Sequence, residues 1–337
     1  MDLTKFALYT ALAIVTYLML LSWQEDYPPI IDDGSVARTE IPQIPNGQSD
    51  ATAVNDLPSD IPTNTPSAPT SSQSDTPTVA PVTASASANT ANPADLISVR
   101  TDTFDIRINP VGGDIVYLAL PLYLKQIDVA DDPFVLLDNQ PGREYVAQSG
   151  LIGRNGVDSN GRATYRTNST SYTMSESADS LDVDLSLVTS DGVGVTKRYS
   201  FSRDSYLIDV NFIINNTTTE TWQANAFGQI KRDAFDDPSD AGGFGRTYLG
   251  FVTTITDDPY IEIEFDDIDD NGSSTLETPG GWMAFSQHYF ITAWIPAIDS
   301  TTQLTTRKNS SNQYYGEFTS RPFDVAAGES GNHTIQY

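Results

Sequence analysis

Histidine is the usual base of nucleophilic catalysis, and this chain of 337 residues has two, His288 and His333. A Ser-His-Asp site needs such a histidine beside a serine that is held at a sharp turn. The nearest match to that turn is Gly328-Glu329-Ser330-Gly331-Asn332, which lacks the final glycine of the G-x-S-x-G pattern and precedes a predicted strand. The segment therefore indicates a turn rather than a nucleophile.

His288 lies in the run WMAFSQHYFITAWIP, where both alternating faces are largely apolar. This setting favours a histidine that is satisfied within or beside a hydrophobic core over a general base. No spacing in the sequence identifies a catalytic partner for it.

A possible cation site is formed by Asp267, Asp269, Asn271 and Gly272, which fit the opening D-x-[DN]-x-[DN]-G of a calcium loop. Such a loop gathers oxygen ligands and closes with a glutamate at its twelfth position. That position holds Thr278 here, and no flanking helix is evident. The pattern favours an acidic surface turn, with calcium binding as the alternative.

Adjacent carboxylates at Asp236-Asp237 and Asp257-Asp258 could in principle serve a glycosidase, which needs two acids across a cleft. With 45 acidic residues in the chain, such neighbours are expected by chance. We therefore predict no catalytic, cofactor-binding or metal-binding residues and no enzymatic activity.

Charge argues against a nucleic-acid-binding protein, and the cysteine content excludes a lipoprotein. The chain has 18 basic and 45 acidic residues, for a net charge of −27, which repels nucleic acid. It has no cysteine, so it forms no disulfide and carries no lipid on a cysteine. The folded part must be stabilised by a buried core.

A membrane anchor is predicted at residues 6–24, nineteen residues without a charge. At about 1.5 Å per residue this helix nearly spans a hydrocarbon core of about 30 Å. Lys5 precedes the run and Glu25 and Asp26 follow it, which predicts a cytoplasmic N-terminus (1–5) and a periplasmic remainder. A cleaved signal peptide is disfavoured because the run is long and Ser22-Trp23-Gln24 is no cleavage site.

Residues 25–95 are rich in Pro, Ser, Thr and Ala and contain ten acidic residues and one basic one, Arg38. Such a segment buries too little apolar surface to offset its ordering entropy. We expect a disordered linker that keeps the following domain at a distance from the membrane, although inert filler fits the same composition.

Residues 96–337 alternate apolar and polar side chains, as half-buried strands do. We predict a large antiparallel β-sandwich. Its clearest part is a three-strand meander over residues 180–216, with a primed turn at Asp191-Gly192 and Tyr206, Ile208, Val210, Phe212 and Ile214 on one face of the third strand. Further strands are predicted at Phe104–Ile108, 260–265, 282–295, 314–318 and from 334 onward.

The order of these parts carries a resemblance. An anchor and spacer are followed by ISVRTDTFDIRINPVGGDIVYLALPLY, Gln148-Ser149-Gly150-Leu151, Phe227-Gly228-Gln229 and GGWMAFSQHYFITAWIP at Gly280–Pro296. Together they resemble the N-terminal portion of the bacterial YidC-type membrane protein insertases. By their chemistry, the glycines and aromatic residues of these motifs are folding signals rather than a site.

The resemblance implies an extended, mutarotase-like sandwich in the periplasm, ahead of a membrane domain that inserts and helps fold inner-membrane proteins, alone or beside the Sec translocon. It implies client proteins, translocon subunits and the lipid bilayer as partners, without nucleic acid or cofactor. No position here matches the family's insertion groove. Because the sequence stops at Tyr337 inside a predicted strand, we expect a truncated product.

Two alternatives remain open. The fold analogy suggests a membrane-tethered, sugar-active enzyme, which would need a concave face that holds His288 and a carboxylate. The sandwich is also compatible with a binding module that presents an edge or groove to extended segments.

Overall fold

The computed structural model describes residues 96–126, 129, 131–235, 248–297 and 301–337, together with Tyr17. The predicted N-terminus (1–5), anchor (6–24) and linker (25–95) thus lie outside the described residues, apart from Tyr17. No helix in the described ranges is long and apolar enough to cross a membrane. The chain divides into two compact units, Met1–Thr52 and Ala53–Tyr337, and the second contains all the elements below.

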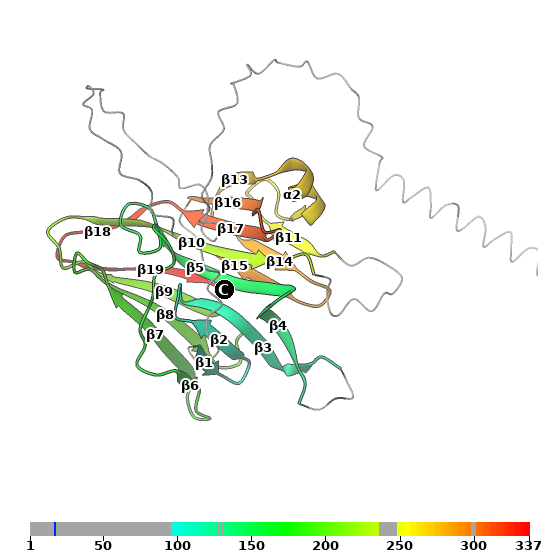
Figure 1. The fold of residues 1–337 in the computed structure, drawn as a ribbon, viewed down its shortest axis with the longest axis horizontal. Coiled ribbons are helices and arrows are strands. Elements are labelled where there is room, and N and C mark those ends of the chain that lie inside the picture. The colour runs from blue at the N-terminus through cyan, green and yellow to red at the C-terminus, as the bar shows by residue number, and fades with distance from the viewer. Residues whose placement is uncertain (1–16, 18–95, 127–128, 130, 236–247, 298–300) are drawn as a thin grey trace, which may run out of the picture. The chain divides into compact units, whose positions relative to one another are not determined.

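The larger sheet has eleven strands, antiparallel except where β1 pairs with β6 (Figure 1). Its order is β13 (Ser274–Pro279), β16 (Thr301–Lys308), β17 (Tyr314–Ser320), β10 (Trp222–Arg232), β5 (Arg143–Ile152), β4 (Pro133–Gln140), β3 (Asp114–Leu124), β2 (Asp105–Asn109), β1 (Ile97–Arg100) and β6 (Ser171–Thr173), with β18 (Phe323–Val325) beside β10. The strand predicted at Phe104–Ile108 is confirmed as β2, and that at 314–318 as β17.

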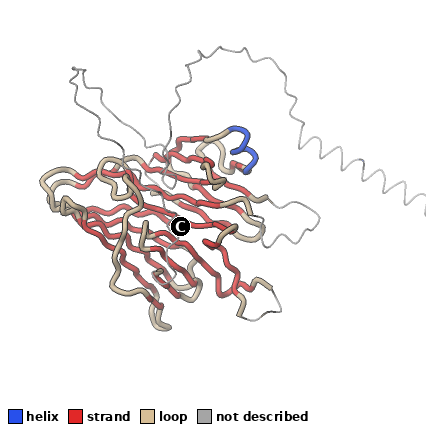
Figure 2. Tube along the Cα trace, in the orientation of Figure 1, coloured by secondary structure: helices blue, strands red, loops and turns tan. Residues whose placement is uncertain are grey.

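Two four-stranded sheets form the other layer. One has the order β12 (Ile261–Ile263), β11 (Gly250–Thr253), β14 (Met283–Ser286) and β15 (Ile291–Trp294). The other has the order β19 (Ser330–Gln336), β9 (Ile208–Asn215), β8 (Gly194–Ser202) and β7 (Ser180–Val188). A bridge between Ile295 and Gln336 joins the two. The predicted large antiparallel β-sandwich is confirmed, and Figure 2 shows how far strands dominate the described residues.

One hydrophobic core lies between the layers and contains side chains from both. On β9, Ile208, Val210, Phe212 and Ile214 are completely buried, whereas the residues between them are half-buried. The alternation of apolar and polar residues in the sequence therefore corresponds to the buried and half-buried faces of the strand. The predicted meander is confirmed as β7, β8 and β9 in antiparallel register.

Two details of the meander prediction are wrong. The third strand begins at Ile208, so Tyr206 lies outside it and is 45% exposed. The turn at Asp191-Gly192 is not primed, because Gly192 has a positive φ of 92° while Asp191 does not. A primed type I′ turn needs positive φ at both central residues. The Thr189 N–H instead donates to the Val193 carbonyl oxygen at 2.9 Å across a longer loop.

The single strand predicted over 282–295 is two strands, β14 and β15, paired as a hairpin. The Gln287 N–H donates to the Phe290 carbonyl oxygen at 2.8 Å and closes the turn. The turn contains neither glycine, proline, asparagine nor aspartate, and the apolar residues of the run continue through it. The sequence therefore carries no local mark of the reversal.

The strand predicted at 260–265 is also shorter, because β12 ends at Ile263 and the helix α2 (Phe265–Asn271) follows. The predicted acidic turn is thus wrong in its conformation. The Glu264 backbone N–H donates to the Asp267 carboxylate at 2.8 Å, half of a capping box at the helix start. Ile268 anchors the helix to the core at 2% exposure. The strand predicted from 334 onward lies within β19.

Candidate functional site

The motif residues that the sequence distributes over 180 positions meet in one buried hydrogen-bonded chain. The Trp294 indole N–H donates to the Gln229 carbonyl oxygen at 3.0 Å. The Gln229 side-chain amide donates to Gln148 at 2.8 Å, and the Gln148 amide donates to the Asp114 carboxylate at 3.0 Å. Strands β15, β10, β5 and β3 are therefore connected through polar groups at the centre of the sandwich.

Arg162 continues this chain from a loop between β5 and β6. Its guanidinium pairs with the Asp114 carboxylate, pairs with Asp158 at 3.2 Å and donates to the Ser149 carbonyl oxygen at 2.8 Å. Burial by itself lowers the pKa of Arg162, but the charges of Asp114 and Asp158 outweigh it and raise that pKa above its ordinary value. The guanidinium is a permanent cation, fixed by two carboxylates.

Lys197 reaches the same place from β8 in the opposite layer. Its ammonium donates to the carbonyl oxygens of Gly112 at 3.0 Å, Gly113 at 2.9 Å and Ser149 at 2.9 Å. Three acceptors match the three N–H groups of a charged lysine. Burial lowers the pKa of Lys197 to about 7, against the opposing effect of Asp114. Lys197 thus ties the two layers together.

Two of the motif glycines are required by close approach. Gly112 has a positive φ of 81°, and a Cβ there would lie 2.5 Å from the Arg162 guanidinium. A Cβ at Gly228 would lie 2.5 Å from the Phe318 ring and 2.7 Å from the Trp294 ring. The motifs therefore maintain the packing around the polar chain, in agreement with the prediction that they are folding signals.

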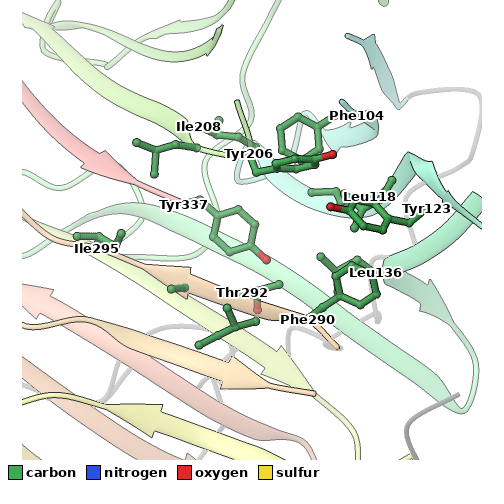
Figure 3. Close-up of a pocket in the computed structure, with 14 residues that line it drawn as sticks. Phe104, Leu118, Tyr123, Leu136, Tyr206, Ile208, Phe290, Thr292, Ile295 and Tyr337 are labelled. Atoms are coloured by element: carbon green, nitrogen blue, oxygen red, sulfur yellow. The ribbon is translucent and has the colours of Figure 1, made fainter. Parts of the chain in front are cut away.

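An apolar cleft lies elsewhere, where β15 and the start of β9 face the end of β3 (Figure 3). Its volume is about 270 Å³. None of the fourteen residues that line it is charged. The Tyr337 ring points into it, near Thr292, whose hydroxyl shares a 2.5 Å hydrogen bond with Tyr145.

The rim of this cleft exposes large apolar side chains. Tyr123, Tyr206 and Ile291 line it and are 46%, 45% and 55% exposed. Leu122, 68% exposed, precedes Tyr123, and Tyr289, 72% exposed, precedes the lining residue Phe290. Exposed apolar side chains that gather at one place mark an interaction surface. No spacing signal in the sequence indicated this cleft, because its walls come from six segments that are far apart in the chain.

The two histidines lie on different elements of the structure. His288 is half-buried in the β14–β15 turn, with its ring 4.1 Å from that of Tyr289, and it is not among the residues that line the cleft. His333 on β19 stacks on Phe323 at 4.5 Å, and burial lowers its pKa. Ser330 begins β19 directly after the turn at Gly328, where a turn was predicted.

The acidic candidates are separated as well. Asp267 accepts the N–H at the start of α2, while Asp269 pairs with Lys308 at 2.7 Å. Within the described ranges, no three histidine or acidic side chains are grouped as a metal site would require. Asp257 and Asp258 are exposed on a bend, and Asp236 and Asp237 lie outside the described residues.

Comparison with solved structures finds matches of low similarity. A galactose mutarotase-related enzyme from Lactobacillus acidophilus aligns with a TM-score of 0.43 and 11% identity, covering 72% of this chain and 96% of its own. A galactose mutarotase-like protein from Lactobacillus casei aligns with a TM-score of 0.46 and 10% identity, covering 71% and 98%.

Comparison of sequences is more decisive. The chain is 42% identical over 98% of its length to a protein named membrane protein insertase YidC from Ectopseudomonas mendocina, and 40% identical over 98% to one of that name from Stutzerimonas stutzeri. It spans 58% and 57% of those relatives. A family model described as the YidC periplasmic domain matches residues 96–337. The predicted resemblance is confirmed, and the chain belongs to the YidC periplasmic domain family.

Proposed function

We propose that this chain is the anchor and periplasmic region of a membrane protein insertase and chaperone, which inserts and folds inner-membrane proteins alone or with the Sec translocon. The observation that carries the proposal is the 42% identity, over 98% of the chain, to a relative named for that activity. Because the chain spans 58% of that relative, the proposal assigns the insertion groove to the part of the protein that this sequence does not cover.

Complementation tests the activity. The intact gene that encodes this chain should restore growth to cells depleted of their own insertase, whereas residues 1–337 alone should not. One predicted helix cannot enclose a groove for a nascent segment. Immunoblots of membranes must report equal amounts of both proteins. Rescue by residues 1–337 would overturn the division of labour, and failure of the intact gene would overturn the function.

The proposed topology places residues 1–5 in the cytoplasm, 6–24 in the inner membrane, and the linker (25–95) and sandwich (96–337) in the periplasm. The chain has no cysteine, so single-cysteine variants report one position each. In spheroplasts, an impermeant maleimide should label S49C and V188C but should label T4C only after the membrane is permeabilised. Labelling of T4C in intact spheroplasts would contradict the orientation.

Client proteins, translocon subunits and lipid are the proposed partners. A photo-crosslinking residue at Tyr289, which is 72% exposed beside the cleft, should capture client or translocon proteins in native membranes. The matched control is Val188, which is 73% exposed on β7. Equal products from both positions would mean that the cleft rim has no part in these contacts.

We propose no enzymatic role for the sandwich. The sugar-active hypothesis needs His288 and a carboxylate in one cleft. His288 lines neither the apolar cleft nor the polar pocket that contains Asp191 and Glu220. Purified protein should not accelerate the mutarotation of galactose above the rate in buffer. Acceleration that His288→Ala abolished would revive the enzyme hypothesis.

A further inference from the structure

A polar pocket lies where three chain connections meet beside β18 (Figure 1). Its walls come from residues 154–160 after β5, from the β7–β8 turn at 189–193, and from 218–222, where the β9–β10 turn enters β10. Its volume of about 620 Å³ is within the roughly 300–1,000 Å³ of typical small-molecule sites. It shares no residue with the apolar cleft and is therefore a second cavity, of ligand size.

The walls of the polar pocket are tied to one another by hydrogen bonds. The Asn155 N–H donates to the Gln223 carbonyl oxygen at 2.9 Å, and the Gln223 N–H donates to the Asn155 side-chain oxygen at 3.0 Å. The Thr217 hydroxyl donates to the Gly192 carbonyl oxygen at 2.9 Å and connects the β9–β10 turn to the β7–β8 turn. The shape of the pocket is therefore fixed without a ligand.

Two buried polar side chains hold the same loops from behind. Asn216 is completely buried, and its amide donates to the carbonyl oxygens of Glu220 at 2.8 Å and Val325 at 3.0 Å. Asp158 is also completely buried and accepts from the Leu151 N–H at 2.9 Å. Buried polar groups are favourable only when they are hydrogen bonded, so these contacts fix the loop backbones. A pre-organised pocket loses little conformational entropy when a ligand binds.

The lining of the polar pocket carries charges of both signs. Eleven of its fifteen residues have a polar side chain; eight of these are neutral hydroxyls or amides, and the others are Arg154, Asp191 and Glu220. Among the described residues, neither the Arg154 guanidinium nor the Glu220 carboxylate takes part in an ion pair or hydrogen bond. A donor and an acceptor of opposite charge thus line one cavity without pairing.

This lining suits a neutral ligand with many hydroxyl groups. A guanidinium only donates hydrogen bonds and a carboxylate only accepts them, whereas a hydroxyl does both. A sugar can therefore accept from Arg154, donate to Glu220 and bond to the neutral hydroxyls and amides between them. An apolar ligand would leave these polar groups without partners, and an anion would meet two carboxylates.

We propose that the polar pocket binds a neutral oligosaccharide, with Arg154 as a hydrogen-bond donor and Glu220 as an acceptor. The inference concerns binding alone and includes no bond cleavage. It goes beyond the proposed insertase function and does not depend on it, because every residue that lines the pocket belongs to the sandwich.

Saturation-transfer NMR tests binding. The probes are maltose, cellobiose and N,N′-diacetylchitobiose, each added to the purified chain in a polyoxyethylene detergent, whose headgroup contains no sugar. At least one of these disaccharides should receive saturation from the protein and give a measurable Kd. If none of them does, the proposal is wrong.

Matched substitutions test the location of binding. R154A and E220A each remove one hydrogen bond to a charged group and should weaken the binding of the best probe about tenfold. R166A and E176A change the same residue types at exposed positions that do not line the pocket, and they should leave the Kd unchanged. All four residues are exposed, so the melting temperature should stay the same. A Kd that neither R154A nor E220A raised would overturn the assignment of the site.

Glycine betaine tests the class of ligand. A zwitterion is the competing class, because its carboxylate could pair with Arg154 and its cation with Glu220. Betaine should neither bind nor displace the disaccharide. If betaine displaces the disaccharide and R154A abolishes that effect, the pocket belongs to zwitterions and the oligosaccharide proposal is wrong.

Discussion

The ammonium of Lys197 on β8 donates to the carbonyl oxygen of Ser149 on β5 at 2.9 Å, so a charged side chain of one layer is hydrogen bonded to the backbone of the other. Lys197 is completely buried. Its remaining hydrogen bonds go to Gly112 and Gly113 beside β3. A buried cation with three backbone acceptors is a specific inter-layer connection rather than general packing.

Removing this cation should destabilise the sandwich strongly. Lys197→Met keeps most of the side-chain volume but removes the ammonium group. Three carbonyl oxygens then lose their donor, and the Asp114–Arg162–Asp158 cluster loses a neighbouring cation. Breaking a buried ionic network from one side costs about 3–5 kcal/mol. The measurement is urea unfolding of the purified chain in detergent, followed by tryptophan fluorescence. Lys308→Met removes an exposed pair with Asp269 and should leave the midpoint unchanged. Equal effects of the two substitutions would refute the role of Lys197.

Stability should rise with pH above neutrality. The pKa of Lys197 is about 7 in the folded protein, against 10.5 ordinarily, so between these values the unfolded chain binds more protons than the folded one. The free energy of unfolding then increases with pH across this window, and the gain is absent below about pH 7. Urea midpoints at pH 7, 8 and 9 measure it. Above pH 10 the burial-raised pKa values of Tyr165 and Tyr199 reverse the sign.

The control for this pH dependence is the Lys197→Met variant. It has no titrating group at the position, so its urea midpoint should be flat between pH 7 and 9. A wild-type midpoint that is as flat as that of the variant over this range would show that Lys197 keeps its proton in the folded protein. The charges of Asp114, Asp158 and Arg162, which surround the lysine, would then have overcome the effect of burial.

Adding one methyl group at Gly228 should be costly. Its Cβ would lie within 2.7 Å of the Trp294 ring, and both sides of this contact are buried core. Overpacking of this kind costs about 1–3 kcal/mol. Gly194→Ala on β8 is the matched control, because its Cβ would meet Asn215 at an ordinary 3.6 Å. We expect a lowered melting temperature for Gly228→Ala alone; a fall of equal size in Gly194→Ala would point to a general intolerance of strand glycines.

Calcium should not stabilise the chain. The motif that resembles a calcium loop begins inside α2, where Asp267 accepts the capping N–H and Asp269 pairs with Lys308. These carboxylates do not converge on one point. Millimolar calcium should therefore leave the melting temperature where magnesium leaves it. A rise specific to calcium that Asp269→Asn removed would restore the calcium hypothesis.

The sequence by itself determined the class of the fold and the family. Alternation in β7, β8 and β9 is a property of neighbouring residues, because side chains on a strand point to opposite faces in turn. The ordered motifs could be recognised without knowing their contacts. The hairpin at Gln287–Phe290 escaped prediction because its turn lacks any residue with turn preference.

Only the tertiary structure decided what the motifs do and where a partner could bind. Lys197 and Gly112 are 85 residues apart, and Trp294 and Gln229 are 65 apart, so no local pattern connects them. The apolar cleft exists because β15, the segment before β9 and the end of β3 meet there. Such contacts depend on how strands pair and layers pack. These residues are far apart in the chain, and no periodic pattern in the sequence connects them.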